Sequence, residues 1–249
     1  MWIKTIYQGC LDLLFPPRCG ICQIYLEAGN RKTLCPDCLS RVRSLQEPVC
    51  LSCGIEVYSA GTGQPLCGEC LRKPPPFDFA RSLFRYDDDI RLLISRLKYN
   101  KDMSVLPCLS ELIQQSELTL FASCDYYVPV PLHRKRLRQR GFNQALWLTR
   151  LCFGKHNPRI APAVLQRTIN SVPQVTLNGR ERRKSLKKAF ICSTKIDISG
   201  ASVCLVDDVY TTGTTVSECS RALLAGGAER VVVLTLARVA VPHRGRGGS

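Results

Sequence analysis

The chain has 249 residues, of which 45% are hydrophobic, enough to bury a substantial core and to exclude a largely disordered protein. Lysine and arginine number 35 against 20 acidic residues, so the formal net charge is +15. This charge favours a polyanionic partner, either nucleic acid or a ligand rich in phosphate, and does not choose between them.

The first 17 residues are predicted to form an N-terminal helix. Apolar side chains recur at helical spacing from Ile3 to Leu14, and Pro16 ends the pattern. The segment is too short and too polar to cross a membrane, and Gln8 and Asp12 interrupt the apolar run that a signal peptide needs. We therefore expect a cytoplasmic protein without membrane insertion, in which this helix packs against the module that follows it.

Residues 18–73 contain four C-x2-C pairs, a spacing that presents two sulfurs to one tetrahedral zinc ion. The eight cysteines suffice for two four-cysteine sites. The predicted ligands are Cys19, Cys22, Cys35, Cys38, Cys50, Cys53, Cys67 and Cys70. Because such sites are closed, we expect two structural Zn²⁺ ions in a double zinc ribbon, and no zinc chemistry.

The four pairs can be combined in two ways. Sequential pairing gives two successive ribbons and is the arrangement that we predict. A cross-brace, which joins the first pair to the third and the second to the fourth, is also compatible with the spacing. A disulfide framework is the alternative to zinc, but the chain shows no signal peptide, and its other cysteines read as small hydrophobes in a reducing compartment.

Three consecutive prolines, Pro74 to Pro76, form a stiff linker and mark a domain boundary, so the second domain is predicted at residues 74–241. Predicted strands at 79–86, 126–131, 203–206 and 231–236 alternate with predicted helices at 87–99, 104–115, 143–153 and 215–224. This alternation predicts an α/β fold with a mainly parallel, doubly wound sheet. The basic, glycine-rich residues 242–249 are predicted to be a disordered tail.

Residues 134–140 carry five cations in seven positions, after a predicted strand that runs into Pro131. We predict a basic loop there, whose arginines grip a pyrophosphate group. The same side chains would also track a single-stranded nucleic-acid backbone, and a solvated surface loop is the third interpretation. His133 is more often a structural residue than a general base, and Asn143 is expected to cap the next helix.

A second basic segment, residues 174–188, is a candidate lid that excludes water from a closed site. An exposed linker explains the same composition equally well.

The strand at 203–206 runs into two adjacent acids and a hydroxyl-rich turn, Thr211 to Thr215, followed by a helix. The helix N-terminus offers unpaired N–H groups and positive dipole charge, so this turn is predicted to bind a phosphate. The lysine of a nucleoside triphosphatase loop is missing. Asp207 and Asp208 would repel a phosphate unless they bind sugar hydroxyls or a divalent cation. A phosphorylated ribose with Mg²⁺ satisfies both conditions.

Together these features resemble the ComF/GntX family over nearly the whole chain. The resemblance rests on Phe15-Pro16-Pro17-Arg18-Cys19, the four cysteine pairs, Arg96-Leu97-Lys98-Tyr99, Val130-Pro131-Leu132, Arg140-Gly141-Phe142-Asn143-Gln144, Gln174 with Leu177, Arg183 and Ala189-Phe190. Residues 207–215 resemble the 5-phosphoribosyl 1-pyrophosphate (PRPP) signature of type I phosphoribosyltransferases. One departure is Ser185, where the family usually has asparagine two residues after the arginine.

The resemblance implies a type I phosphoribosyltransferase-like domain behind the double zinc ribbon, and a link to DNA uptake or utilisation in competence. The residues expected to bind PRPP, with Mg²⁺, are Asp207, Asp208, Thr211, Thr212, Gly213, Thr214, Thr215, Pro131, Leu132, Arg136 and Arg138. Asp207, Asp208 and Arg140 are the expected catalytic residues. The expected partners are PRPP or a phosphoribosylated ligand, single-stranded DNA and a DNA-uptake helicase. We expect PRPP binding to survive the loss of a zinc ligand such as Cys53, since the linker separates the two domains.

Two classes of function follow. The first is a phosphoribosyltransferase, a glycosyltransferase that moves a phosphoribosyl group to an acceptor that no residue set identifies. The second is a non-catalytic adaptor that retains the fold and binds single-stranded DNA or a partner protein. The intact acid pair favours at least retained ligand binding, because an adaptor gains nothing from acids beside a phosphate site. A purely structural zinc protein explains the cysteines and leaves the acids without a purpose.

Overall fold

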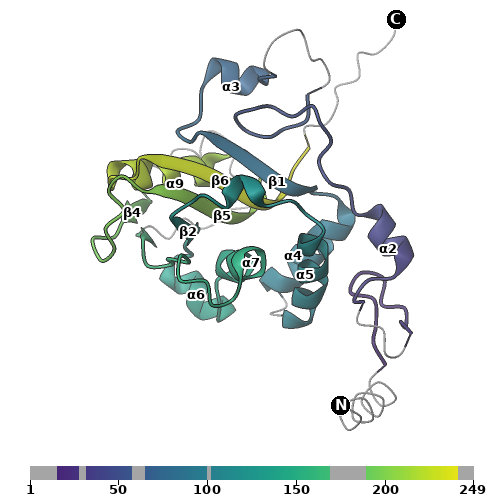
Figure 1. Cartoon of the computed structure of the whole chain (residues 1–249). Helices are drawn as coiled ribbons and strands as arrows, with labels where there is room; N and C mark the ends of the chain where they lie inside the picture. The colour runs from purple at the N-terminus through teal and green to yellow at the C-terminus, as the bar shows by residue number, and fades with distance from the viewer. Residues whose placement is uncertain (1–15, 28–31, 58–64, 100–101, 169–188, 241–249) are drawn as a thin grey trace, which may run out of the picture.

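The computed structural model describes residues 16–27, 32–57, 65–99, 102–168 and 189–240 (Figure 1). Its helices are α2 (Pro36–Arg41), α3 (Gly68–Arg72), α4 (Asp88–Tyr99), α5 (Leu106–Gln114), α6 (Arg134–Arg140), α7 (Gln144–Phe153) and α9 (Thr214–Ala225), with 3-10 turns at Met103–Val105 and Thr119–Phe121. Its strands are β1 (Phe79–Arg85), β2 (Tyr126–Pro129), β3 (Leu165–Arg167), β4 (Phe190–Cys192), β5 (Ser202–Tyr210) and β6 (Arg230–Arg238). None of the helices in these ranges is long and apolar enough to cross a bilayer.

Three sequence predictions fall on other residues. The N-terminal helix, except for its last two positions, lies outside the described ranges. So do the candidate lid at 174–188, with Ser185, and the tail predicted at 242–249.

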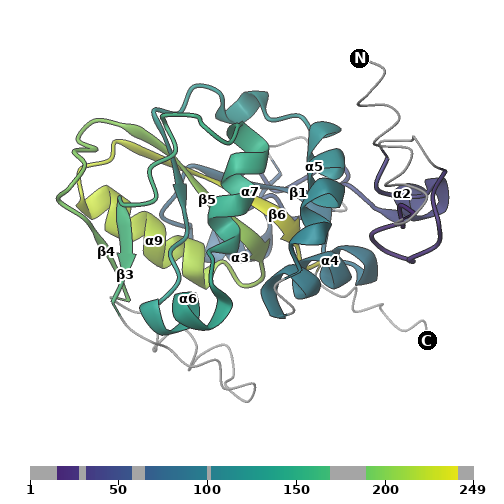
Figure 2. The ribbon, with the colours of Figure 1, turned by 90° about the horizontal axis from the view of Figure 1, so that it is seen from below.

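Four strands form one parallel sheet in the order β1-β6-β5-β2. Leu205 of β5 lies opposite Val233 of β6, and Tyr127 of β2 lies opposite Cys204. The inner strands are nearly continuous aliphatic runs because other elements cover both of their faces. Figures 1 and 2 show α4, α5 and α7 on one side of the sheet and α3 on the other. The predicted α/β fold with a parallel sheet is therefore confirmed.

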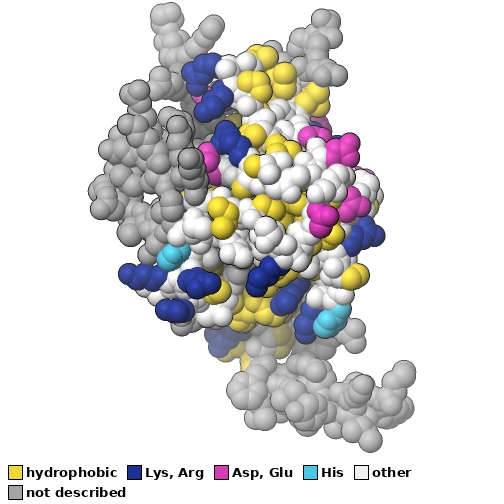
Figure 3. All heavy atoms as spheres, turned by 90° about the vertical axis from the view of Figure 1, so that its left-hand side faces the viewer, with side chains coloured by type: hydrophobic (Ala, Val, Ile, Leu, Met, Phe, Trp, Pro, Cys, Tyr) yellow, Lys and Arg dark blue, Asp and Glu magenta, His cyan; other side chains and the backbone are white. Residues whose placement is uncertain are grey.

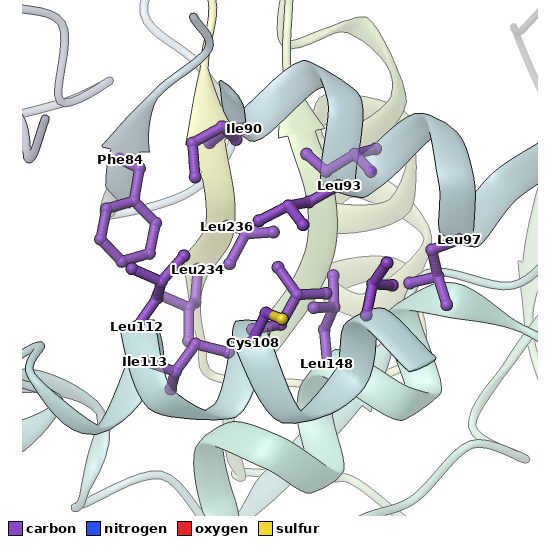
Figure 4. Packing of buried hydrophobic residues seen from close by; sticks show 14 of the residues in the cluster. Phe84, Ile90, Leu93, Leu97, Cys108, Leu112, Ile113, Leu148, Leu234 and Leu236 are labelled. Atoms are coloured by element: carbon purple, nitrogen blue, oxygen red, sulfur yellow. The ribbon is translucent and has the colours of Figure 1, made fainter. Parts of the chain in front are cut away.

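Helices α4, α5 and α7 cover one face of this sheet. Helix α4 places Ile90, Leu93 and Leu97 at helical spacing, all fully buried or nearly so. They pack with Leu112 of α5 and Leu234 of β6 in a single cluster (Figure 4). This packing fixes the last turn of α4 against the sheet.

The opposite face packs against α9. Val216, Cys219 and Leu223 lie on one side of that helix and share a cluster with Val203 of β5 and Val231 of β6. Helix α9 therefore starts directly behind the carboxyl end of β5, the edge at which parallel sheets bind ligands.

The zinc-ribbon region wraps around the outer strand β1. Cys19 belongs to the core with α4 and α5, whereas Cys50 belongs to the core with α9, on the opposite face. Between them the chain follows β1, where the Ala80 N–H donates to the Ser52 carbonyl at 2.7 Å. The boundary predicted at the prolines remains a prediction, and the regions on its two sides share both hydrophobic cores.

Two segments differ from the sequence expectation. Residues 134–140 form helix α6 and not a loop, with His133 Nδ1 accepting from the Lys135 N–H at its start and Gly141 at its end. Arginine and lysine favour helices, but a segment made mostly of them has no periodic spacing of apolar residues. The apolar pattern therefore did not predict this helix. The antiparallel pair β3–β4 was also missed, because three-residue strands are too short to reveal alternation.

Candidate anion site and zinc centres

The turn between β5 and α9 carries the predicted phosphate-binding residues. Gly213 has a φ of +71° and directly precedes Thr214, the first residue of α9. This left-handed conformation suits glycine. The Thr212 and Thr214 hydroxyls hydrogen-bond each other at 2.8 Å. Because the first amides of a helix lack helical acceptors, the turn presents N–H and hydroxyl groups together at the positive end of the dipole.

A pocket opens at this turn, and one of the predicted acids lies in its wall. The pocket is lined by Asp207, Val209, Tyr210, Thr211, Gly213, Thr214, Thr215 and Val216. The structure thus brings an acid of the strand and the hydroxyl-rich turn to one cavity, as the strand–turn–helix pattern predicts.

Asp207 and Asp208 leave β5 in different directions, because successive side chains of a strand alternate between its faces. Both are half-buried. Burial raises the pKa of Asp207 to about 7, and the neighbouring charge of Asp208 adds to the increase. The Asp208 N–H donates to Asp207 Oδ1 at 2.9 Å and acts in the opposite direction. Asp207 therefore titrates near neutral pH.

Lys98, in the last turn of α4, neutralises the second acid. Its Nζ lies 2.6 Å from Asp208 Oδ2, and the two side chains are 21% and 14% exposed. Burial alone would lower the pKa of Lys98, but the carboxylate of Asp208 outweighs it and raises that pKa. Sequence reasoning quoted Lys98 inside a family motif and gave it no role, since no local pattern pairs it with an acid so distant in the chain.

Helix α6 turns two of the predicted arginines inward. Arg136 and Arg140 are one turn apart, share a helix face and are half-buried. The guanidinium of Arg140 lies 5.5 Å from the centre of the Tyr99 ring, and its charge acts on Lys98. Arg138 is exposed and lies on the opposite side of the helix. The three arginines grouped by sequence thus separate into an inward pair and an outward residue.

Arg167 of β3 is a further cation that sequence reasoning missed. Burial lowers its pKa, and the nearby charge of Arg136 lowers it further, whereas Asp207 acts to raise it. Its guanidinium lies 5.3 Å from the centre of the Phe190 ring. The signal available in the sequence was only a lone arginine after Leu165.

Pro131 and Leu132 line a different surface. They border an apolar groove with Leu137, Gly141, Phe142, Asn143, Leu146, Trp147, Arg150 and Pro162. Asn143 caps α7 as predicted, with its Oδ1 accepting from the Ala145 N–H at 3.0 Å. Its Nδ2 also donates to the Val130 carbonyl at 3.1 Å, so it ties the start of α7 to the end of β2.

The outer surface near α6 is strongly basic. Lysine and arginine side chains gather in the lower part of the face drawn in Figure 3, at the height where α6 lies in Figure 1. Arg134, Lys135 and Arg138 of α6 are all exposed. This basic surface borders the apolar groove, because Leu137 of α6 lines it.

The eight predicted zinc ligands form two clusters. The Sγ atoms of Cys19, Cys22, Cys35 and Cys38 lie within 4.8 Å of one another, and so do those of Cys50, Cys53, Cys67 and Cys70. Sequential pairing is therefore confirmed, and the cross-brace is excluded. Four thiolate donors match the preference of Zn²⁺ and leave no open coordination position, so the clusters fit two structural zinc ions.

Comparison with known proteins agrees with this arrangement. A family model described as "Double zinc ribbon domain" matches residues 10–71. "DNA utilization protein YhgH" of Escherichia coli O157:H7 is 32% identical over 231 residues, covering 91% of this chain and 99% of that protein. "Competence protein F" of Haemophilus influenzae is 30% identical, covering 89% and 96%. "Competence protein ComFC" of Bacillus subtilis is 26% identical, covering 82% and 84%.

Proposed function

Because this chain belongs to the ComF/GntX family, we propose that it binds PRPP at the carboxyl end of β5 and transfers or retains its phosphoribosyl group during DNA uptake or utilisation. The observation that supports this most strongly is the pocket that joins Asp207 to the turn Thr211–Thr215. An acid and a phosphate cradle in one cavity suit a ligand that carries a phosphate next to sugar hydroxyls.

The three parts of PRPP find matching groups. The 5-phosphate fits the N–H and hydroxyl groups of Thr211–Thr215 at the start of α9. The ribose hydroxyls donate to the carboxylates of Asp207 and Asp208. The pyrophosphate lies toward the inward cations Arg136 and Arg140, because guanidinium groups bind phosphate oxygens in bidentate geometry.

Phosphoribosyl transfer breaks the bond between the anomeric carbon and the pyrophosphate oxygen. The electron pair leaves with pyrophosphate, and positive charge develops on the ribose. Arg136 and Arg140 stabilise the growing negative charge, while the carboxylates of the acid pair stabilise the ribose. When bound, Mg²⁺ supplies further positive charge to the pyrophosphate. Because Lys98 already pairs with Asp208, the acid pair would hold Mg²⁺ only together with oxygen atoms of the bound PRPP.

Lys98 has a positioning role in this proposal. Its ammonium group lies 2.6 Å from Asp208 Oδ2 and fixes the direction of that carboxylate. Asp208 therefore stays ready to accept from a hydroxyl, although it is half-buried beside another acid.

A cellular experiment tests the link between PRPP and DNA. In a strain that lacks the protein, Asp207→Asn with Asp208→Asn should fail to restore DNA uptake or use, although the variant binds single-stranded DNA normally. Full restoration would favour the adaptor. The matched control is Asp88→Asn, which removes the negative charge of an exposed acid outside the site.

A second function is favoured by the outer face of α6. Its exposed cations border an apolar groove that contains Phe142 and Trp147, and this combination suits a single strand that pairs backbone charge with base stacking. In the adaptor version the protein holds DNA here without turnover, and a DNA-uptake helicase is the expected protein partner.

A further inference from the structure

Arg238, at the end of β6, is a buried cation that pairs with no carboxylate among the described residues. Its side chain is 5% exposed, and its Nε finds no hydrogen-bond acceptor within the described ranges. The guanidinium donates instead to the Cys53 carbonyl at 2.7 Å and to Cys53 Sγ at 3.4 Å. A buried guanidinium is costly unless negative charge compensates it.

The second cysteine cluster supplies that charge when it holds zinc. Four thiolates around one Zn²⁺ carry a net charge of −2. Arg238 contacts the sulfur of one of these ligands, so the loaded centre compensates its burial. Hydrogen-bond donors to metal-bound thiolates commonly orient and stabilise metal centres in this way.

Arg238 also contacts the anion site. Its guanidinium lies 4.0 Å from the centre of the Tyr210 ring, in cation–π geometry, and the two residues are register partners on β5 and β6. Tyr210 is buried and lines the pocket at the phosphate turn. Its hydroxyl lies so close to Gly213 that a Cβ added there would collide with it. The position of Tyr210 therefore fixes the backbone of the turn at the start of α9.

We propose that the second zinc centre stabilises the anion site. The negative charge of the zinc-loaded centre attracts Arg238, which holds Tyr210 in place. Tyr210 in turn keeps the turn Thr211–Thr215 in its binding conformation. The ligand-binding part of this inference rests on the proposed function, whereas the link from metal to turn does not. The first zinc centre lies on the opposite face of the sheet, where Arg41 donates to Cys38 Sγ at 3.2 Å and pairs with Asp89 of α4, so its contacts run to α4 rather than to Tyr210.

Two ligand variants of the full-length protein separate the two centres. Cys67→Ser and Cys22→Ser each remove the least buried ligand of one cluster. Metal analysis should find one zinc ion lost in each. We expect hydrogen exchange of residues 211–217 to accelerate at least about tenfold in Cys67→Ser and to remain unchanged in Cys22→Ser. Equal exchange in both variants, or unchanged exchange in Cys67→Ser, would overturn the inference.

Variants of the relay itself provide the second test. In Arg238→Met, zinc should leave the second centre at least about tenfold faster under a chelator, and the turn should exchange faster. Arg238→Lys should restore part of both effects. Arg85→Met is the matched control, since Arg85 is the neighbour of Arg238 on β1 and binds Glu56 of the ribbon at 2.7 Å. If Arg85→Met also released zinc faster and loosened the turn, Arg238 would merely hold the ribbon against the sheet, and the inference would be overturned.

Tyr210→Phe keeps the ring and removes only the hydroxyl, so we expect it to fold. It therefore tests the relay even if Arg238→Met does not fold. It should retain both zinc ions and still loosen the turn. If wild-type protein failed to bind PRPP but showed these zinc-dependent exchange changes, the proposed function would fall and the relay would stand. If PRPP bound equally well with and without the second zinc ion, the relay would fall and the function would stand.

Discussion

The Lys98 ammonium lies 2.6 Å from the carboxylate of Asp208, and this ion pair joins the last turn of α4 to the acid pair of β5. It connects the helical layer on one face of the sheet with the edge where the phosphate turn begins. The acid pair is therefore asymmetric: one carboxylate has a cationic partner, and the other titrates near neutral pH.

Replacing Lys98 by methionine should weaken PRPP binding about tenfold or more, because Asp208 then lacks the cation that pairs with it and orients it. Arg91→Met, an exposed change on the same helix, should leave the affinity unaltered. Calorimetric titration measures both. Wild-type or tighter binding in Lys98→Met would mean that the lysine blocks the site rather than prepares it.

The raised pKa of Asp207 gives stability a defined pH dependence. A carboxyl whose folded pKa exceeds its unfolded value contributes stability that is present below the unfolded pKa and lost as pH rises through the folded pKa. For Asp207 this window runs from 3.8 to about 7. Asp207→Asn cannot titrate, so it should be more stable than wild type at pH 8, by as much as about 4 kcal/mol, and not at pH 4. Urea unfolding at both pH values checks the sign, and a lower stability at pH 8 would contradict it.

Ligand binding should show the opposite trend. The ionised carboxylate of Asp207 offers two acceptor oxygens and no competing donor, so PRPP affinity should increase as pH rises from 6 to 8. The phosphates of the ligand also titrate in this range. The informative quantity is therefore the difference in PRPP affinity between wild type and Asp207→Asn at each pH. If the two affinities changed with pH in parallel, Asp207 would not be part of the binding site.

Variants on the two faces of α6 should affect the binding of different ligands, PRPP for the inward face and DNA for the outward face. Arg136→Ala with Arg140→Ala should reduce PRPP affinity strongly, since both arginines lie on the inward, half-buried face of α6. Arg134→Ala with Arg138→Ala should leave PRPP binding intact and reduce affinity for every single-stranded DNA sequence alike. It should also flatten the salt dependence by roughly 0.7 for each phosphate group that the protein ceases to neutralise. Each pair is the control for the other. Identical effects of both pairs on both ligands would mean that α6 acts only through its total charge.

Local patterns predicted much of the fold. The apolar spacing of α4, the asparagine cap of α7 and the strand–turn–helix around Gly213 all act within a few residues, so the sequence displays them directly. The cysteine spacing likewise predicted both zinc clusters, and sequential pairing followed because neighbouring pairs meet in space.

The missed features depend on contacts between distant segments. Lys98 meets Asp208, and Arg238 meets Cys53, only after the sheet has formed. The proline linker suggested a zinc module that could fail without harming the PRPP site. The contacts of Arg238 now lead us to expect the reverse for the second centre, because charge compensation crosses the predicted boundary.

The most direct test of the central claim is calorimetric titration of the zinc-loaded protein with PRPP, with and without Mg²⁺, beside the double variant Asp207→Asn, Asp208→Asn. We predict Mg²⁺-dependent binding to wild type and none to the folded double variant, which loses the charges that serve the ligand rather than the core. Equal PRPP binding by wild type and the double variant would contradict the placement of the site at the carboxyl end of β5.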